Sequence, residues 1–225
     1  MTAGLSTASW DAAIRSPYLR WLTESKAREN RRAAGRSLNG AADWMDLVRW
    51  PDPQGMAAYA ASVGLDAPPG TAFDYSSGNT LLLSGIVRDA AAAEGTSALE
   101  LARRELFAPL GMEGVTLELD ATGTPVGSTY MLAPARDWAR LGLLYLNDGA
   151  LGGRRILPEG WVERSTTPTL DTGYGAGWWT NRVAGNIPWS PVPWGLPGAP
   201  PDAFFARGLL GQYVVVVPSA RLVVV

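Results

Sequence analysis

A tyrosine surrounded by small polar residues precedes an apolar run in the stretch GTAFDYSSGNTLLLSGIV, residues 70–87. The side chain of Tyr75 could exchange a proton with a substrate. An unperturbed phenol titrates near pH ~10, so it needs a neighbouring positive charge to be a useful base at neutral pH. The alternative is a buried ring that closes the entry to a helix. Taken without further context, the stretch favours the buried ring.

The composition narrows the chemistry that such a tyrosine could join. The 225 residues include no histidine and no cysteine. A Ser-His-Asp triad, thiol chemistry and histidine-ligated zinc are therefore excluded for these residues. Lys26 is the only lysine, so Asp, Glu, Tyr and Lys26 are the candidates for acid–base work. We expect no metal and no other cofactor.

Charge and hydropathy also limit the partners. The net charge of −2 provides no basic field for a nucleic acid. No apolar run reaches the length of about 18 residues that a membrane span requires. With 47% hydrophobic and 18% charged residues, the composition is that of a globular chain.

Helical patterns dominate residues 1–170. The sequence predicts a short helix in 55–65 and a helix over 79–93 that is apolar on most faces and therefore buried. Ser97 and Glu100 form a capping-box pattern ahead of a third helix, which Pro109 and Gly111 are expected to stop. A fourth helix is predicted within 133–149, with Asp137 as a carboxylate in its first turn.

Strand patterns fill residues 171–225. They are predicted in 173–183, 203–207, 211–218 and 221–225, and the turn PSA indicates that the last two form an antiparallel hairpin. Trp178 and Trp179 should lie on opposite faces of their strand, one in the core and the other at a cleft. The expected class is α+β, with residues 1–225 forming a single incomplete domain.

Several stretches, in this order and spacing, resemble the serine β-lactamase and penicillin-binding-protein-like family. The branch that they resemble holds class C-type esterases and 6-aminohexanoate-dimer hydrolases. The stretches are FDYSSGNTLLLSGIV, MLAPARDWARLGLLYLNDGALGGRRILPEGWVE, GYGAGWWTN and DAFFARGLLGQYVVVVPSARLVVV. The resemblance implies a partial β-lactamase/transpeptidase-like fold.

The nucleophile of this family is the serine of an S-x-x-K motif, whose lysine helps to deprotonate it. No S-x-x-K occurs in the 225 residues; Lys26 ends the tetrapeptide TESK, in which Thr23 takes the place of the serine. MTAGLSTASWD, at residues 1–11, resembles a stretch that follows the first motif in the family. We therefore expect an N-terminally truncated chain that lacks a segment of its own domain.

The resemblance assigns roles to particular residues. Tyr75 matches the tyrosine of a Y-x-N motif, which exchanges protons with the nucleophile and the leaving group, and Ser77 stands where asparagine is usual. Leu209, Leu210 and Gly211 occupy the third motif, K-T-G or H-x-G, where leucine cannot supply the family's positive charge or imidazole. Gly211 would let a substrate approach the backbone, and Arg207 would share a face with Leu209 on a regular strand.

A backbone N–H group and a tryptophan side chain complete the predicted site. The backbone N–H of Gln212 matches an oxyanion-hole donor of the family. Trp178 or Trp179 would line the substrate cleft. The chain is thus predicted to belong to a serine hydrolase acting on a small ester or amide, including 6-aminohexanoate oligomers, and to be inactive alone. The alternative is a non-catalytic relative or remnant that only binds a ligand.

Overall fold

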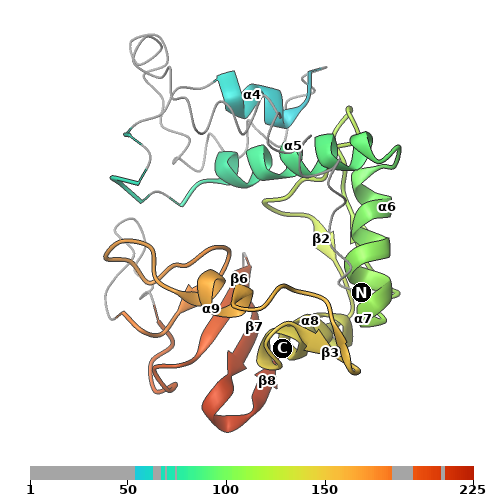
Figure 1. The fold of residues 1–225 in the computed structure, drawn as a ribbon. Coiled ribbons are helices and arrows are strands. Elements are labelled where there is room, and N and C mark those ends of the chain that lie inside the picture. The colour runs from blue at the N-terminus through green and yellow to red at the C-terminus, as the bar shows by residue number, and fades with distance from the viewer. Residues whose placement is uncertain (1–53, 63–66, 69, 74, 184–194, 209–210) are drawn as a thin grey trace. The chain divides into compact units, whose positions relative to one another are not determined.

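The computed structural model describes residues 54–62, 67–68, 70–73, 75–183, 195–208 and 211–225. They form two compact units. The helical unit holds the described residues up to Arg104 and those of 116–132; the sheet unit holds 105–115 and the described residues of 133–225. Helices and antiparallel strands together confirm the α+β class (Figure 1).

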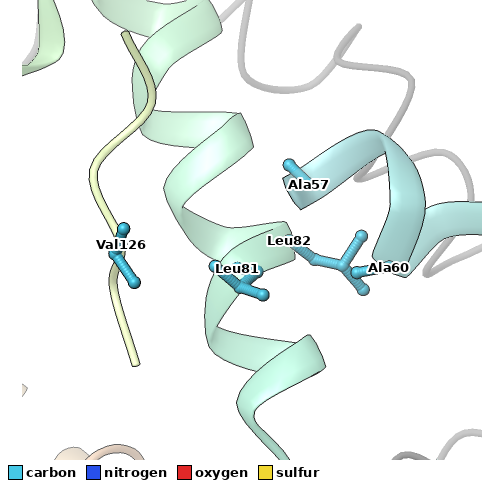
Figure 2. Close-up of a cluster of buried hydrophobic side chains, with 5 residues drawn as sticks. All are labelled: Ala57, Ala60, Leu81, Leu82 and Val126. Atoms are coloured by element: carbon cyan, nitrogen blue, oxygen red, sulfur yellow. The ribbon is translucent and has the colours of Figure 1, made fainter. Parts of the chain in front are cut away.

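The helical unit is organised around two packed helices, α4 (Met56–Ser62) and α5 (Ser77–Ala93). Helix α5 begins where its sequence provides a cap, because the Ser76 hydroxyl accepts a hydrogen bond from the N–H of Gly78 at 3.2 Å. Figure 2 shows the core between the helices and a neighbouring loop, formed by Ala57, Ala60, Leu81, Leu82 and Val126. Alanines at α4 let its backbone lie close to the leucines of α5.

Helix α5 is not buried on every face. Leu83 and Val87 lie one helical turn apart and are 56% and 44% exposed. The prediction of a buried helix is correct for the face that carries Leu81 and Leu82 and wrong for the face that carries Leu83 and Val87.

The capping box at Ser97 forms as predicted. The Ser97 hydroxyl accepts from the Glu100 N–H, and the Glu100 carboxylate accepts from the Ser97 N–H at 3.0 Å. Helix α6 (Ala98–Ala102) follows, then a π-helical turn η2 (Arg103–Phe107) and α7 (Ala108–Leu110). Pro109 lies in the first turn of α7, where proline is tolerated, so only Gly111 ends the helical run, with φ 66°.

Short antiparallel pairs interrupt the region expected to be mainly helical. Strands β1 (Thr116–Leu117) and β2 (Met131–Leu132) pair in the helical unit, and β3 (Ala150–Leu151) and β4 (Arg154–Arg155) in the sheet unit. The sheet unit also holds helices α8 (Ala135–Leu146) and α9 (Trp161–Thr166).

A four-stranded antiparallel sheet carries the C-terminal part, in the order β5-β6-β7-β8. The strands are β5 (Trp179–Thr180), β6 (Phe204–Gly208), β7 (Gln212–Val217) and β8 (Leu222–Val224), with the short 3₁₀ helix η3 (Pro218–Ala220) in the last hairpin. The predicted β7–β8 hairpin is therefore confirmed.

Helix α8 covers one face of this sheet, against β7 and β8. Gly142 allows the close approach, since a Cβ there would lie 2.5 Å from a Val223 methyl carbon. Trp178, Phe204 and Val216 form the buried cluster below the helix, with Tyr145 packed on it. No helix in the described part of the chain is long and apolar enough to span a membrane.

Candidate functional site

Tyr75 lies at the entry to α5, directly before the capping residue Ser76. Its side chain is 44% exposed, so it does not fill the core of the helical unit. Ser77 is the first residue of the helix and is half-buried. The two predicted site residues of the second motif are thus held at a capped helix start, which fixes the backbone that carries them.

The predicted third motif lies in the β6–β7 hairpin of the sheet unit. Gly208 and Gln212 pair across the two strands, so residues 209–211 connect them. Leu209 and Leu210 lie outside the described residues. Gly211 has φ 86°, a conformation that favours glycine, and both Gly211 and Gln212 are exposed. The expected oxyanion donor is therefore the first backbone N–H of β7.

The two adjacent tryptophans point to opposite sides of the sheet. Trp178 packs among the residues under α8, with its ring centroid 4.5 Å from Tyr145 and 5.2 Å from Phe204. Trp179 pairs with Phe205 on the other face and contacts the Tyr174 ring at 4.9 Å. Both tryptophans are buried, each 5% exposed, so burial does not separate a core residue from a cleft residue in this pair, and the role of either one at a cleft stays a prediction.

Arg207 lies near the end of β6, one residue before Gly208. Its guanidinium carbon is 5.8 Å from the centre of the Trp179 ring, within the range of a cation–π contact. Arg207 pairs with Tyr213 across the hairpin, so its side chain shares a face with Tyr213 and Phe205.

Asp137 is a buried structural carboxylate. It lies in the first turn of α8, accepts a hydrogen bond from the N–H of Gly114 at 3.0 Å and pairs with Arg140 at 2.5 Å. These contacts hold the loop after α7 against α8. The position of Asp137 in the first turn of its helix agrees with the prediction from the sequence. The described residues include no group of three or more Asp or Glu side chains arranged to hold a metal ion.

Sequence reasoning missed one polar cluster in the helical unit, which we call the Asp120 clasp. Asp120 accepts hydrogen bonds from the N–H groups of Met56 at 2.9 Å, Thr122 at 2.9 Å and Thr124 at 3.0 Å, and from the Thr122 hydroxyl at 2.7 Å. Arg88 of α5 donates to the Thr124 hydroxyl at 2.9 Å. The clasp thus joins the start of α4, α5 and the β1–β2 connection.

Hydrogen bonding favours the charged form of the Asp120 carboxylate. Burial raises the pKa of Asp120, but donation from the Thr122 hydroxyl and from the N–H groups of Met56, Thr124 and Thr122 outweighs burial and holds the pKa below its ordinary value. The sequence DATGT, residues 120–124, places Thr122 two positions and Thr124 four positions after Asp120, with a glycine between them, which is a local signal of this turn.

Comparisons with solved structures place the fold. A putative 6-aminohexanoate-dimer hydrolase from Bacillus anthracis matches with a TM-score of 0.60 and 27% identity, over 78% of this chain and 43% of that one. A penicillin-binding protein homologue from Caulobacter crescentus matches with a TM-score of 0.57 and 16% identity, over 95% of this chain and 72% of that one. A putative β-lactamase from Bacteroides dorei matches with a TM-score of 0.55 and 19% identity, over 95% of this chain and 66% of that one. These matches confirm the predicted partial β-lactamase/transpeptidase-like fold.

Sequence comparison agrees with the structural one. The family described as Beta-lactamase matches residues 19–225, so the chain belongs to that family. A 6-aminohexanoate-dimer hydrolase from Paenarthrobacter ureafaciens is 34% identical over 92 residues, which is 40% of this chain and 23% of that protein. The chain therefore matches less than half the length of either 6-aminohexanoate-dimer hydrolase.

Proposed function

We propose that these residues are part of a serine hydrolase that cleaves ester or amide bonds through an acyl-enzyme. The observation that carries the proposal is family membership over residues 19–225, together with the 34% identity to a protein named 6-aminohexanoate-dimer hydrolase. That name favours linear amides of the 6-aminohexanoate type, or related esters, as substrates.

In this proposal Tyr75 exchanges protons with the nucleophile and the leaving group. Its exposure at a capped helix start supports a reactive hydroxyl rather than a packing role. Ser77 offers one hydroxyl donor to a substrate carbonyl, where an asparagine would offer an amide. General acid–base catalysis of this kind contributes about 10²–10⁴ in rate.

In the sheet unit, the backbone N–H of Gln212 donates to the oxyanion, and Gly211 lets the substrate approach this N–H. The open space at the Gly211 Cβ position supports close approach of a substrate to the backbone. Such a donor stabilises the transition state by about 3–4 kcal/mol. Trp179 lies on the same sheet face as Arg207 and is our choice of the two tryptophans for contact with the substrate.

The nucleophile has to come from residues other than these 225, because they contain no S-x-x-K. We infer that the isolated chain has little or no hydrolytic activity.

A second candidate function is that of a non-catalytic relative that only binds a ligand. Leu209 favours it, because leucine cannot replace the cation that the family has at this position of the third motif. An in-frame S-x-x-K in the DNA upstream of codon 1 supports the enzyme; a stop codon and promoter there support the non-catalytic relative.

Substrate class is tested on the gene product that carries the S-x-x-K. We expect faster turnover of a p-nitrophenyl ester than of a chromogenic cephalosporin, because Leu209 provides no charge for the rigidly held carboxylate of a β-lactam.

Tyr75→Phe should lower kcat/KM for the ester by about 10²–10⁴, because the variant can no longer exchange a proton at this position.

Tyr59→Phe is the matched control, since Tyr59 is a similarly exposed tyrosine of α4 in the same unit. It should leave turnover unchanged. Faster hydrolysis of the cephalosporin would overturn the substrate preference, and full activity of the Tyr75→Phe variant would remove Tyr75 from the catalytic residues.

A further inference from the structure

Tyr130 has a backbone conformation that tyrosine rarely adopts. It lies directly before β2, and its φ of 60° is in the left-handed region. This conformation costs free energy for residues other than glycine, and a bulky side chain makes it an outlier. Asp148 and Arg221 also have a positive φ, but they follow helix ends, where the left-handed conformation is usual. Tyr130 follows no helix, so no cap accounts for its conformation.

The neighbouring strand holds the backbone of Tyr130 in this conformation. The Tyr130 carbonyl accepts a hydrogen bond from the N–H of Glu118 at 3.2 Å, and the next residue, Met131, pairs with Leu117. A strained backbone persists only where surrounding contacts over-determine it. The ladder supplies these contacts, and it thus fixes the direction in which the Tyr130 side chain leaves the backbone.

The side chain of Tyr130 contributes little to the core of the helical unit. It is 42% exposed, and its hydroxyl has no hydrogen-bond partner within the described part of the chain. A glycine would adopt this backbone conformation without strain, as Gly123 does in the same connection with φ 78°. Because strained residues collect at functional sites, a strained residue with an exposed ring is typical of a ligand contact.

The turn before Tyr130 lies against the first half of α5. A Cβ at Gly127 would overlap the Ser84 hydroxyl and lie 3.3 Å from the Thr80 carbonyl oxygen. Thr80 and Ser84 belong to the first two turns of α5, and Tyr75 lies at the entry to this helix. Tyr130 follows Gly127 by three residues, which span at most about 11 Å. Tyr130 therefore lies in the same unit as Tyr75 and near the half of α5 that Tyr75 precedes.

The exposed ring is suited to an apolar ligand. Leu132, two residues after Tyr130, is 63% exposed, so exposed apolar surface continues into β2. A phenol ring offers a flat apolar face at a small cost in side-chain entropy. Methylene groups are the ligand chemistry that such a face binds.

We propose that Tyr130 is a specificity-determining residue whose ring packs against the aliphatic chain of a linear amide or ester substrate. This inference rests on the proposed function and specifies its substrate as one with several methylene groups beside the scissile bond. A short substrate, such as an acetyl ester, cannot reach the ring with a chain of this kind. Contact with the chain accounts for a tyrosine at a position where glycine would be less strained.

The test is an NMR titration of the 225-residue chain with N-butylhexanamide, a linear secondary amide, and with N-methylacetamide, which carries the same amide without long chains. We expect N-butylhexanamide to bind about tenfold more tightly, because each methylene group that leaves water for the ring favours binding. Tyr130→Gly should remove most of this preference. Tyr130→Phe keeps the ring and should retain it.

Leu170→Gly is the matched control. Leu170 is also an exposed apolar residue with a positive φ, 51°, but it belongs to the sheet unit. Glycine relieves the strain at either position, so both glycine variants should raise the midpoint of thermal unfolding by about 1–4 °C. Only Tyr130→Gly should change the preference for the longer amide. A lower midpoint for Tyr130→Gly would show that the ring stabilises the fold and would overturn the inference.

Equal affinities for the two amides, or no binding of either, overturn the inference; so does an unchanged preference in Tyr130→Gly or its loss in Tyr130→Phe. These outcomes are independent of the hydrolysis assays, because binding to the ring requires no nucleophile. Absence of ester hydrolysis together with an intact preference for the longer amide would count against the proposed function alone.

Discussion

Asp120 is the residue on which the helical unit most visibly depends. Its carboxylate accepts hydrogen bonds from the first N–H of α4 and from the turn that contains Thr122 and Thr124. Gly55 makes this approach possible, because a Cβ there would lie 2.8 Å from Asp120 Oδ2. A single charged acceptor thus fixes two segments that are far apart in the sequence.

Asp120→Asn should lower the free energy of unfolding by about 1–2 kcal/mol at pH 7, because an amide accepts fewer of these bonds and turns an NH₂ towards the donors. Urea unfolding followed by circular dichroism measures the effect. Asp171→Asn is the control, because Asp171 is an exposed turn residue, and it should change stability little. Equal stability of both variants would contradict the role of the clasp.

The sign of the pH dependence follows from the lowered pKa of Asp120. A carboxyl whose pKa is lower in the folded chain contributes stability above its unfolded pKa of about 3.9, and this contribution is lost as the pH falls through the folded value. The difference between the unchanged chain and Asp120→Asn should therefore shrink from pH 7 to pH 3. A difference that grows towards low pH would contradict the assignment.

Single residues also show where sequence reasoning stops. Strand alternation predicts that Trp178 and Trp179 face opposite ways, and they do. It does not tell which face a helix covers, because that depends on the packing of α8. The partners of Asp120 were not predicted, since Met56 lies 64 positions away and no local pattern links them.

At the scale of elements, local signals predicted most helices and the last hairpin. The Ser97–Glu100 box starts α6, the apolar spacing in 135–146 gives α8, and the turn PSA joins β7 to β8. The pairs β1–β2 and β3–β4 have strands of 2 residues, too short to show a period of two, and were not predicted.

The packing of α8 on the sheet gives a prediction at this scale. Gly142→Ala brings a methyl group to 2.5 Å from Val223 and 3.3 Å from Val214. The better helix propensity of alanine gains at most about 1 kcal/mol, whereas overpacking against two β-branched side chains costs about 1–3 kcal/mol. We expect a net loss of stability.

Thermal unfolding measures this loss, with Arg136→Ala as the control at an exposed position of α8. The control should leave the midpoint near that of the unchanged chain. A higher midpoint for Gly142→Ala than for the unchanged chain would show that α8 does not approach β8 as closely as described.

At the scale of the whole molecule, the order of motifs carried more information than any one motif. The Tyr75 stretch alone favours a packing role, and GLLGQ alone is compatible with an ordinary hairpin. Their sequence order, with the stretch at 131–163 between them, predicted the family to which residues 19–225 belong. The contacts between side chains that strand pairing brings together, such as Arg207 and Trp179, could not be predicted in the same way, because no local pattern links residues so far apart in the sequence.

We propose that Tyr75 and the Gln212 amide serve a nucleophile that these 225 residues do not contain. Intact-mass spectrometry of the folded chain after treatment with a fluorophosphonate tests it directly, because that probe bonds covalently to activated serines. We expect an unmodified mass. A stoichiometric adduct on any serine of this chain would contradict it.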